Sequence, residues 1–136
     1  MKNSNKLDAN TSLDFIFGGN STFTALTTKS ENRFTFKVKK HKKDDIYFVS
    51  VLTSPETYQF IGSYRGAFKY SAKSRISDRS QSVSVFKYII DKLSSKNLPN
   101  YIEVWHSGKC GKCGKKLTTP DSISNGFGPT CRRFKN

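Results

Sequence analysis

The chain has 136 residues, a length that suits one domain with a hydrophobic core and excludes two large ones. Its 24 Lys and Arg residues outnumber 10 acidic ones, and the formal net charge of +14 favours a polyanionic partner, most often nucleic acid. No stretch has the ~18 apolar residues that a membrane-spanning helix needs, and the N-terminus lacks the apolar centre of a signal peptide. We therefore expect a cytoplasmic protein without a membrane partner.

The chain divides into three predicted parts. Residues 1–12 are rich in Asn, Lys and Ser without hydrophobic periodicity, which predicts a disordered tail. An α+β sheet domain is predicted over 13–105 and a zinc-binding module over 106–136.

Strand-like patterns follow the tail. In 33–39, Phe34, Phe36 and Val38 alternate with polar side chains, as in a half-buried antiparallel strand with a basic outer face. Similar runs occur at 21–26, 46–52, 58–64, 67–70 and 101–105.

One segment has helical periodicity instead. Its apolar stripe is expected to pack on the sheet, and Ser80 or Ser82 is expected to cap its start. The stripe consists of Val83, Phe86, Ile89, Ile90 and Leu93. The predicted fold class is thus α+β: an antiparallel meander sheet packed by one helix, with a C-terminal treble-clef-like zinc module. A partly open OB-like barrel is an alternative.

All three cysteines lie near the C-terminus in the spacing H-x3-C-x2-C-x17-C, formed by His106, Cys110, Cys113 and Cys131. Four such donors suit a tetrahedral structural zinc ion, Zn²⁺, and a C-x2-C knuckle directs two thiolates at one point. Glycines 111 and 114 are expected to let the knuckle adopt positive φ.

Other interpretations of these residues stay open. Asp121, His41 or a water molecule are alternatives to His106 as fourth ligand, and a water would leave the site open for catalysis. The C-x2-C pair is also compatible with a redox pair or with plain thiols. However, a redox pair usually begins a helix, which the residues after Cys113 do not favour.

Basic residues cluster in three places. Phosphate contacts are predicted from those on the first hairpin and around the cysteines, namely Arg33, Lys37, Lys39, Lys40, Lys42, Lys43, Lys112, Lys115, Lys116, Arg132 and Arg133. Lys69, Lys73, Arg75 and Arg79 form a further basic run. Tyr47, Tyr58, Tyr64 and Tyr70 are candidates for stacking on single-stranded bases, with cross-strand packing as the alternative.

The cysteine-rich segment resembles a family of short, mostly uncharacterised proteins encoded by phages, prophages and plasmids. Their pattern is similar to H-x-G-x-C-x2-C-G-x2-L-T-x-P-x-S-I-x2-G-x-G-P-x-C, which this chain matches from His106 to Cys131. The resemblance implies a viral or mobile-element protein in a bacterial host cytoplasm, and it brings no known activity.

No catalytic motif stands out, since the sequence contains no nucleophile elbow, no phosphate-binding glycine loop and no H-E-x-x-H. We therefore expect a non-enzymatic, zinc-containing protein that binds DNA or RNA through basic surfaces. The alternative function is that of an anti-defence factor, a protein that inhibits a bacterial defence or replication complex by binding to it. A nuclease or other enzyme is the third class.

Overall fold

The computed structural model describes residues 5–118, 123 and 126–128. Within these residues, the helices are Ala9–Ile16 (α1) and Gln81–Ser94 (α2). The strands, in chain order, are Lys6–Leu7 (β1), Asn20–Thr27 (β2), Asn32–Lys40 (β3), Tyr47–Ser54 (β4), Thr57–Tyr64 (β5), Phe68–Tyr70 (β6) and Ile102–His106 (β7).

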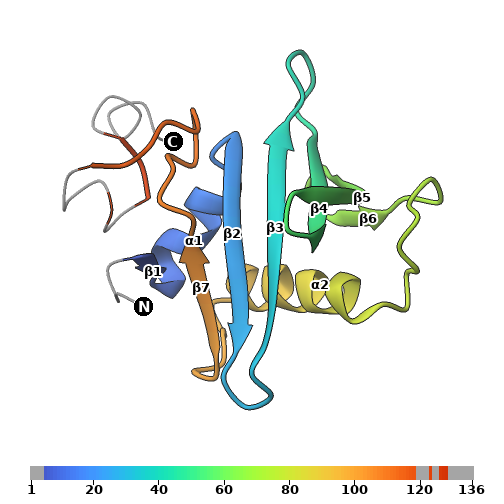
Figure 1. The fold of residues 1–136 in the computed structure, drawn as a ribbon, viewed down its shortest axis with the longest axis horizontal. Helices are drawn as coiled ribbons and strands as arrows, with labels where there is room; N and C mark the ends of the chain where they lie inside the picture. Colours follow the sequence, from blue (N-terminus) through green and yellow to red (C-terminus); the bar gives the residue numbers. More distant parts are fainter. Residues whose placement is uncertain (1–4, 119–122, 124–125, 129–136) are drawn as a thin grey trace.

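In the described part of the chain, the strands form one antiparallel sheet of seven strands in the order β1-β7-β2-β3-β4-β5-β6. Strands β2 to β6 are the predicted meander, and β7 returns from α2 to pair with β2 (Figure 1). Strand β1 pairs with the other side of β7. Because β1 and β6 are the two edges, the sheet is open and does not close into the alternative OB-like barrel.

The alternation predicted for β3 is present. Phe36 and Val38 are fully buried, whereas Lys37 and Lys39 are exposed. Phe36 lies opposite Phe23 of β2, so neighbouring strands direct their apolar side chains toward the same face.

Helix α2 begins as predicted and buries its predicted stripe. The Ser80 hydroxyl accepts a hydrogen bond from the Val83 N–H over 3.3 Å, which satisfies one of the free donors of the first turn. All five stripe residues are buried. The ring centroid of Phe86 lies 5.2 Å from that of Phe36 and 5.1 Å from that of Phe68, so α2 packs against both β3 and β6.

The structure corrects the predicted tail for residues 5–12, because β1 and α1 occupy most of it. Asp8 caps α1 by accepting a hydrogen bond from the Thr11 N–H over 2.8 Å. Leu7 and Phe15 are buried. These apolar residues are too few to show a periodicity in the sequence, and the segment is structured through its contacts with β7 and the core. Residues 1–4 lie outside the described residues.

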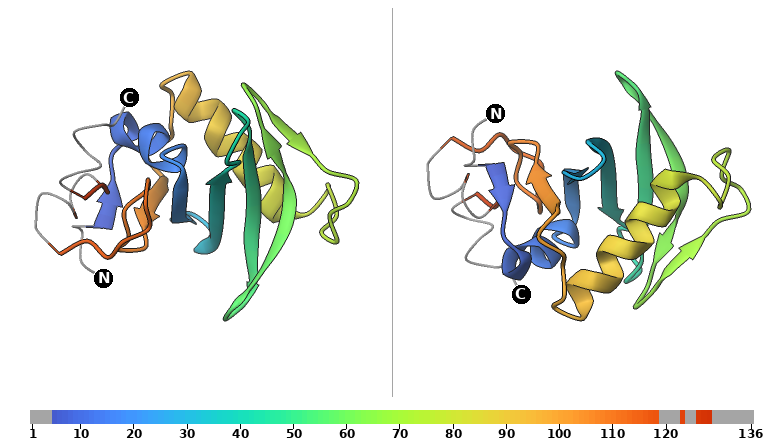
Figure 2. Two further views of the ribbon diagram at one scale, coloured as in Figure 1. Left: turned by 90° about the horizontal axis from the view of Figure 1, so that it is seen from above. Right: turned by 90° about the horizontal axis from the view of Figure 1, so that it is seen from below.

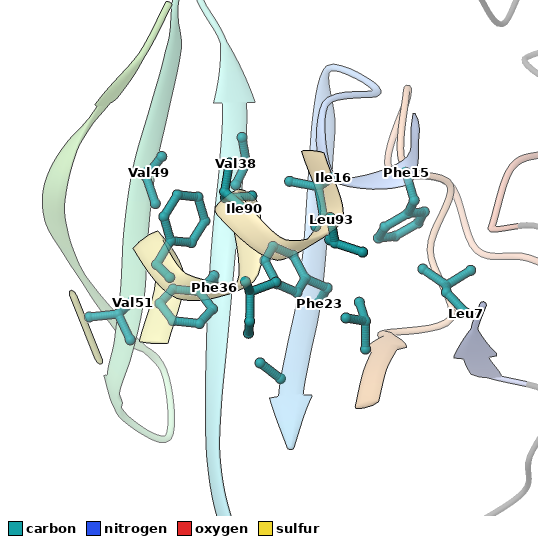
Figure 3. Packing of buried hydrophobic residues seen from close by; sticks show 14 of the residues in the cluster. Leu7, Phe15, Ile16, Phe23, Phe36, Val38, Val49, Val51, Ile90 and Leu93 are labelled. Carbon is teal, nitrogen blue, oxygen red and sulfur yellow. The ribbon is translucent and has the colours of Figure 1, made fainter. Parts of the chain in front are cut away.

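The helices lie on the same side of the sheet, as both views of Figure 2 show. The side chains that fill the space between sheet and helices form one core, which extends from Leu7 and Phe15 to Val49 and Val51 (Figure 3). Among the described residues, no helix covers the opposite side of the sheet, which we call the open face. None of the described helices is long and apolar enough to cross a membrane.

Candidate metal centre and basic sheet face

Residues 109–116, which we call the knuckle, form a tight turn held by backbone hydrogen bonds. The Cys110 N–H donates to the Lys115 carbonyl over 2.8 Å, and the Gly114 N–H donates to the Cys110 carbonyl over 2.9 Å. Gly114 has φ of +79°, a conformation that side chains with a Cβ rarely adopt. The glycine following the second cysteine therefore allows the chain to turn back, as predicted.

The sulfur of Cys110 sits among several hydrogen-bond donors. The Lys112 N–H lies 3.4 Å from it. Burial acts to raise the pKa of the Cys110 thiol, but hydrogen bonds from the backbone N–H groups of Gly128, Cys113 and Lys112 and from the Cys113 side chain lower the pKa to about 7. Both cysteines are free thiols. A pair of adjacent thiols, one of them stabilised as thiolate, fits the donor set that zinc requires.

The knuckle packs on the same core as the sheet. The Asn20 N–H at the start of β2 donates to the Gly111 carbonyl over 2.8 Å, and the Gly111 N–H donates to the Gly126 carbonyl over 2.9 Å. Cys110, Leu117 and Phe127 are buried members of the core cluster. The described part of the predicted zinc module is thus in direct contact with the predicted sheet domain.

Gly111 serves a different purpose from the one predicted. It does not adopt positive φ. Instead, a Cβ at this position would stand 2.8 Å from Phe15 Cδ1 and 2.9 Å from the Phe15 carbonyl oxygen. Glycine is needed at 111 because α1 approaches the knuckle too closely for any side chain.

His106 ends β7 and is buried, and both of its ring nitrogens have hydrogen-bond partners. Nδ1 accepts from the Gly108 N–H over 2.9 Å, so the proton of the neutral ring is on Nε2, which donates to the Ile123 carbonyl. Burial lowers the pKa of His106, and the hydrogen bond to Ile123 opposes this shift. A metal bound to His106 would have to replace one of these two partners.

The structure places the predicted metal ligands as follows. Cys110 and Cys113 are brought together, but among the described residues no three His, Cys, Asp or Glu side chains converge as a metal-binding group. The alternative ligand His41 lies in the β3–β4 hairpin, where its Nδ1 accepts from the Lys43 N–H over 3.1 Å. Cys131 and Asp121 lie outside the described residues.

The predicted basic residues of β3 share the open face. Because side chains alternate along a strand, Arg33, Lys37 and Lys39 all project from the side of β3 opposite Phe36. Each is exposed. Further exposed lysines lie at the end of β3 (Lys40), in the hairpin that follows it (Lys42 and Lys43) and in the knuckle (Lys112, Lys115 and Lys116). Arg132 and Arg133 lie outside the described residues.

The hairpin and knuckle lysines lie on either side of the start of β2. Lys39 is the sheet partner of Asn20, and the Lys40 N–H donates to the Gly19 carbonyl over 3.0 Å. On the other side, a Cβ at Gly19 would stand 3.4 Å from the Lys112 carbonyl oxygen. Two basic clusters far apart in sequence are thus neighbours in the fold.

The predicted stacking tyrosines divide into two groups. Tyr47, Tyr64 and Tyr70 pack against the core, and Tyr47 lies opposite Tyr64 in the sheet. The Tyr47 hydroxyl donates to the Phe17 carbonyl over 3.0 Å. Tyr58 instead has the Lys37 ammonium 5.2 Å from its ring centroid. It lies opposite Leu52, on the open face.

Two phenylalanines that sequence reasoning missed also lie on the open face. Phe48 is the sheet partner of Lys39, and Phe60 is the partner of Ser50, which in turn pairs with Lys37. The signal was present in β4, because a strand that buries Val49 and Val51 must turn Phe48 to the other side.

Two hollows lie along this basic surface. One, of about 480 Å³, is lined by Phe48, His41 and the lysines at 39, 40, 42 and 43. The other, of about 220 Å³, lies over β7, β2 and β3 and includes Trp105 and Arg33. Acidic side chains nearby include Asp44, whose carboxylate lies 3.7 Å from His41 Nδ1, and the exposed Asp45 that follows it. Glu103 pairs with Lys6 over 3.3 Å.

Comparison with protein families matches residues 105–133 to a "Family of unknown function (DUF6011)". The matched segment begins at Trp105 in β7 and includes the knuckle and all three cysteines. Comparison with curated proteins finds no match, and neither does comparison with solved structures.

Proposed function

We propose that this protein is a non-enzymatic, zinc-containing protein that binds nucleic acid through the open face and the adjoining basic clusters. The main support for this proposal is the placement of Arg33, Lys37 and Lys39, which the sequence predicts as phosphate contacts. They project from one strand onto a sheet face that no described helix covers. Lysine and arginine side chains so arranged attract phosphate groups, and their contact with the phosphates releases counterions condensed on the nucleic acid.

Positive charge extends from this face in two directions, which supports a contact surface longer than one strand. The hairpin lysines continue it beyond the end of β3, and Lys112 lies across β2 from them. With a formal net charge of +14, the whole chain also steers polyanions toward this surface.

The proposed zinc ion would be held by Cys110, Cys113, Cys131 and His106. The support is the knuckle geometry, in which backbone N–H groups point at the Cys110 sulfur and lower its thiol pKa to about 7. Bound zinc contributes folding free energy to a segment that has few apolar residues of its own. It would thereby hold Lys112, Lys115 and Lys116 in place beside β2.

Binding is tested by fluorescence anisotropy with labelled single- and double-stranded oligonucleotides at several salt concentrations. We expect affinity to fall as salt rises, with a log–log slope of about −0.9 per phosphate contacted on duplex DNA. A double variant, Lys37→Gln with Lys39→Gln, should reduce that slope by about 1.8 if both side chains contact phosphates.

The matched control is Lys87→Gln with Lys96→Gln, which removes the same charge from exposed positions in and just after α2. It should change binding much less. Equal losses in the two double variants would show that only net charge matters. Salt-insensitive or absent binding at low salt would overturn the proposal and favour a protein partner instead.

Zinc is tested by native mass spectrometry of the purified protein. We expect one zinc ion per chain, lost in Cys110→Ser and Cys113→Ser, with Lys115→Ala as a control in the same knuckle. If His106→Gln retains zinc, His106 is not a ligand, and the proposed ligand set is reduced to the three cysteines. A wild-type protein that is folded yet binds no zinc after incubation with it would overturn the metal proposal.

A further inference from the structure

We propose that the open face takes single-stranded nucleic acid, with bases stacked on Phe48 and Phe60 and phosphates held by the lysines of β3 and its hairpin. This inference rests on the proposed function and adds the strandedness of the ligand and the aromatic contacts. Phe48 and Phe60 have no role in the charge-based proposal.

The sheet register places each ring in a row with a lysine. Lys39 lies directly opposite Phe48, and Lys37 is separated from Phe60 only by Ser50. The two rows are two residues apart on β3, so about 7 Å separates them along the strand. The lysines therefore lie along β3 and the rings lie beside them on β4 and β5. A single strand can place its phosphates along the lysines and stack its bases on the rings.

The exposure of Phe48 is unusual for its residue type. Its side chain keeps 38% of its surface open to solvent, whereas Phe15, Phe23, Phe36 and Phe86 are almost completely buried. An exposed phenylalanine costs hydrophobic stabilisation that burial would supply. A base that stacks on the ring would remove this apolar surface from water.

The neighbours of Phe48 leave room for such a base. Its ring meets that of Phe60 in an edge contact, with centroids 6.2 Å apart and an interplanar angle of 61°. The His41 ring also approaches by its edge, at 5.8 Å and 73°. Phe48 further lines the hollow of about 480 Å³ together with four lysines, so aromatic and phosphate-binding groups share one depression.

The rings of Phe48 and Phe60 with the neighbouring lysines form a surface that we call the platform, and a third ring extends it along β5. Tyr58 lies on the open face with Lys37 5.2 Å from its centroid, and this contact holds the ammonium over an aromatic surface. At the other end, Trp105 and Arg33 line the hollow of about 220 Å³. Trp105 is itself buried, with 8% of its surface exposed, so the rings open to a base lie on β4 and β5.

These rings favour single strands over duplexes. In a duplex, both faces of a base are covered by its neighbours, so a side chain on a sheet surface reaches only backbone and groove edges. An unpaired base exposes its face and can stack on an aromatic ring whatever its identity. Exposed lysines alone would bind either form, so the aromatic side chains determine the preference.

The experiment compares Phe48→Ala and Phe60→Ala with wild type, using labelled oligo(dT) of about 15 nucleotides, a length within one typical binding site. A duplex of equal length is titrated in parallel. We expect each variant to weaken oligo(dT) binding by about 5- to 150-fold, the range for loss of one stacked base, while duplex binding stays within about twofold. Phe48→Trp should restore binding to oligo(dT).

The matched control is Tyr88→Ala, because Tyr88 has the same 38% exposure but lies on α2, on the other side of the sheet. It should leave both affinities unchanged. Circular dichroism should be unaltered in Phe48→Ala, since this side chain is exposed. Trp105, the single tryptophan of the chain, lies on the open face and should change its fluorescence when oligo(dT) binds.

The outcomes separate this inference from the proposed function. If the lysine double variant loses binding while Phe48→Ala and Phe60→Ala bind oligo(dT) normally, the stacking platform is overturned and the charge-based function stands. Equal losses for single strand and duplex would also overturn it. If wild type binds neither form at low salt, both proposals fail together.

Discussion

The ring of Phe15 in α1 lies directly against the backbone of Gly111 in the knuckle. A Cβ at Gly111 would stand 2.8 Å from Phe15 Cδ1, closer than real Cβ contacts come. Phe15 also faces His106, with ring centroids 5.7 Å apart, and Phe127 at 6.0 Å. The N-terminal helix and the cysteine-rich segment are therefore parts of one packing unit, although Phe15 and Gly111 are 96 positions apart in the sequence.

We expect Gly111→Ala to destabilise the protein by about 1–3 kcal/mol, the usual cost of overpacking a filled core. Neither the Phe15 ring nor its backbone can yield without moving α1. Urea denaturation followed by circular dichroism measures the change. Gly128→Ala is the matched control, because a Cβ there meets no atom of the described residues within 4 Å. Equal stability of the two variants would contradict the contact.

In metal-free protein, one thiol should titrate near pH 7. The ultraviolet absorbance of the thiolate measures this titration. The lowered pKa of Cys110 predicts this, since hydrogen bonds from Gly128, Cys113 and Lys112 outweigh the opposing effect of burial to give a value of about 7. The transition should vanish in Cys110→Ser and move to higher pH in Cys113→Ala, which removes the side-chain donor at position 113. A transition near pH 7 that survives in Cys110→Ser would refute the assignment.

The lowered pKa of Cys110 also predicts how the free energy of unfolding of the metal-free protein depends on pH. The folded-state pKa of Cys110, about 7, is below the ordinary value of about 8.5 expected in the unfolded chain. The folded state therefore binds fewer protons between these values. Its stabilising contribution is fully present above about pH 8.5 and is lost as pH falls through about 7. Denaturant midpoints of wild type and Cys110→Ser across this range measure the difference.

Phe86→Ala should destabilise the protein by about 3–5 kcal/mol, the usual cost of removing a buried phenylalanine and leaving a cavity. Its ring lies between α2 and the sheet, 5.2 Å from the Phe36 centroid. Lys87→Ala, the adjacent exposed position, should change stability by less than about 0.5 kcal/mol. Chemical denaturation of both variants provides the comparison, and similar midpoints would argue against the α2 packing.

Asp8→Ala should cost about 1 kcal/mol, because the Thr11 N–H would lose its hydrogen-bond acceptor. Asp8→Asn keeps an acceptor oxygen at the cap and should be close to wild type. Thermal denaturation distinguishes the two variants. If alanine and asparagine behave alike, Asp8 does not cap α1 in solution.

Local periodicity accounts for most of the elements that the sequence predicts. The alternation of Phe36 and Val38 with lysines marks β3, and the stripe from Val83 to Leu93 marks α2, because each pattern reflects which side of one element is buried. The alternation of side chains along β4 likewise requires Phe48 to project from the face of the sheet opposite to that of Val49. The cysteine spacing by itself likewise indicates a knuckle, since a C-x2-C turn is a local arrangement.

Only the tertiary structure decided how these parts meet. Strand β7 pairs between β1 and β2, α1 begins within the segment predicted as a tail, and Gly111 is glycine because Phe15 approaches it. The physical reason is that local patterns depend on one segment and its solvent, whereas pairing order and close contacts depend on apolar surface buried between segments distant in sequence. The sequence alone thus determined which side chains face outward on β3, and the fold decided that Phe48, Phe60 and the lysines share one surface.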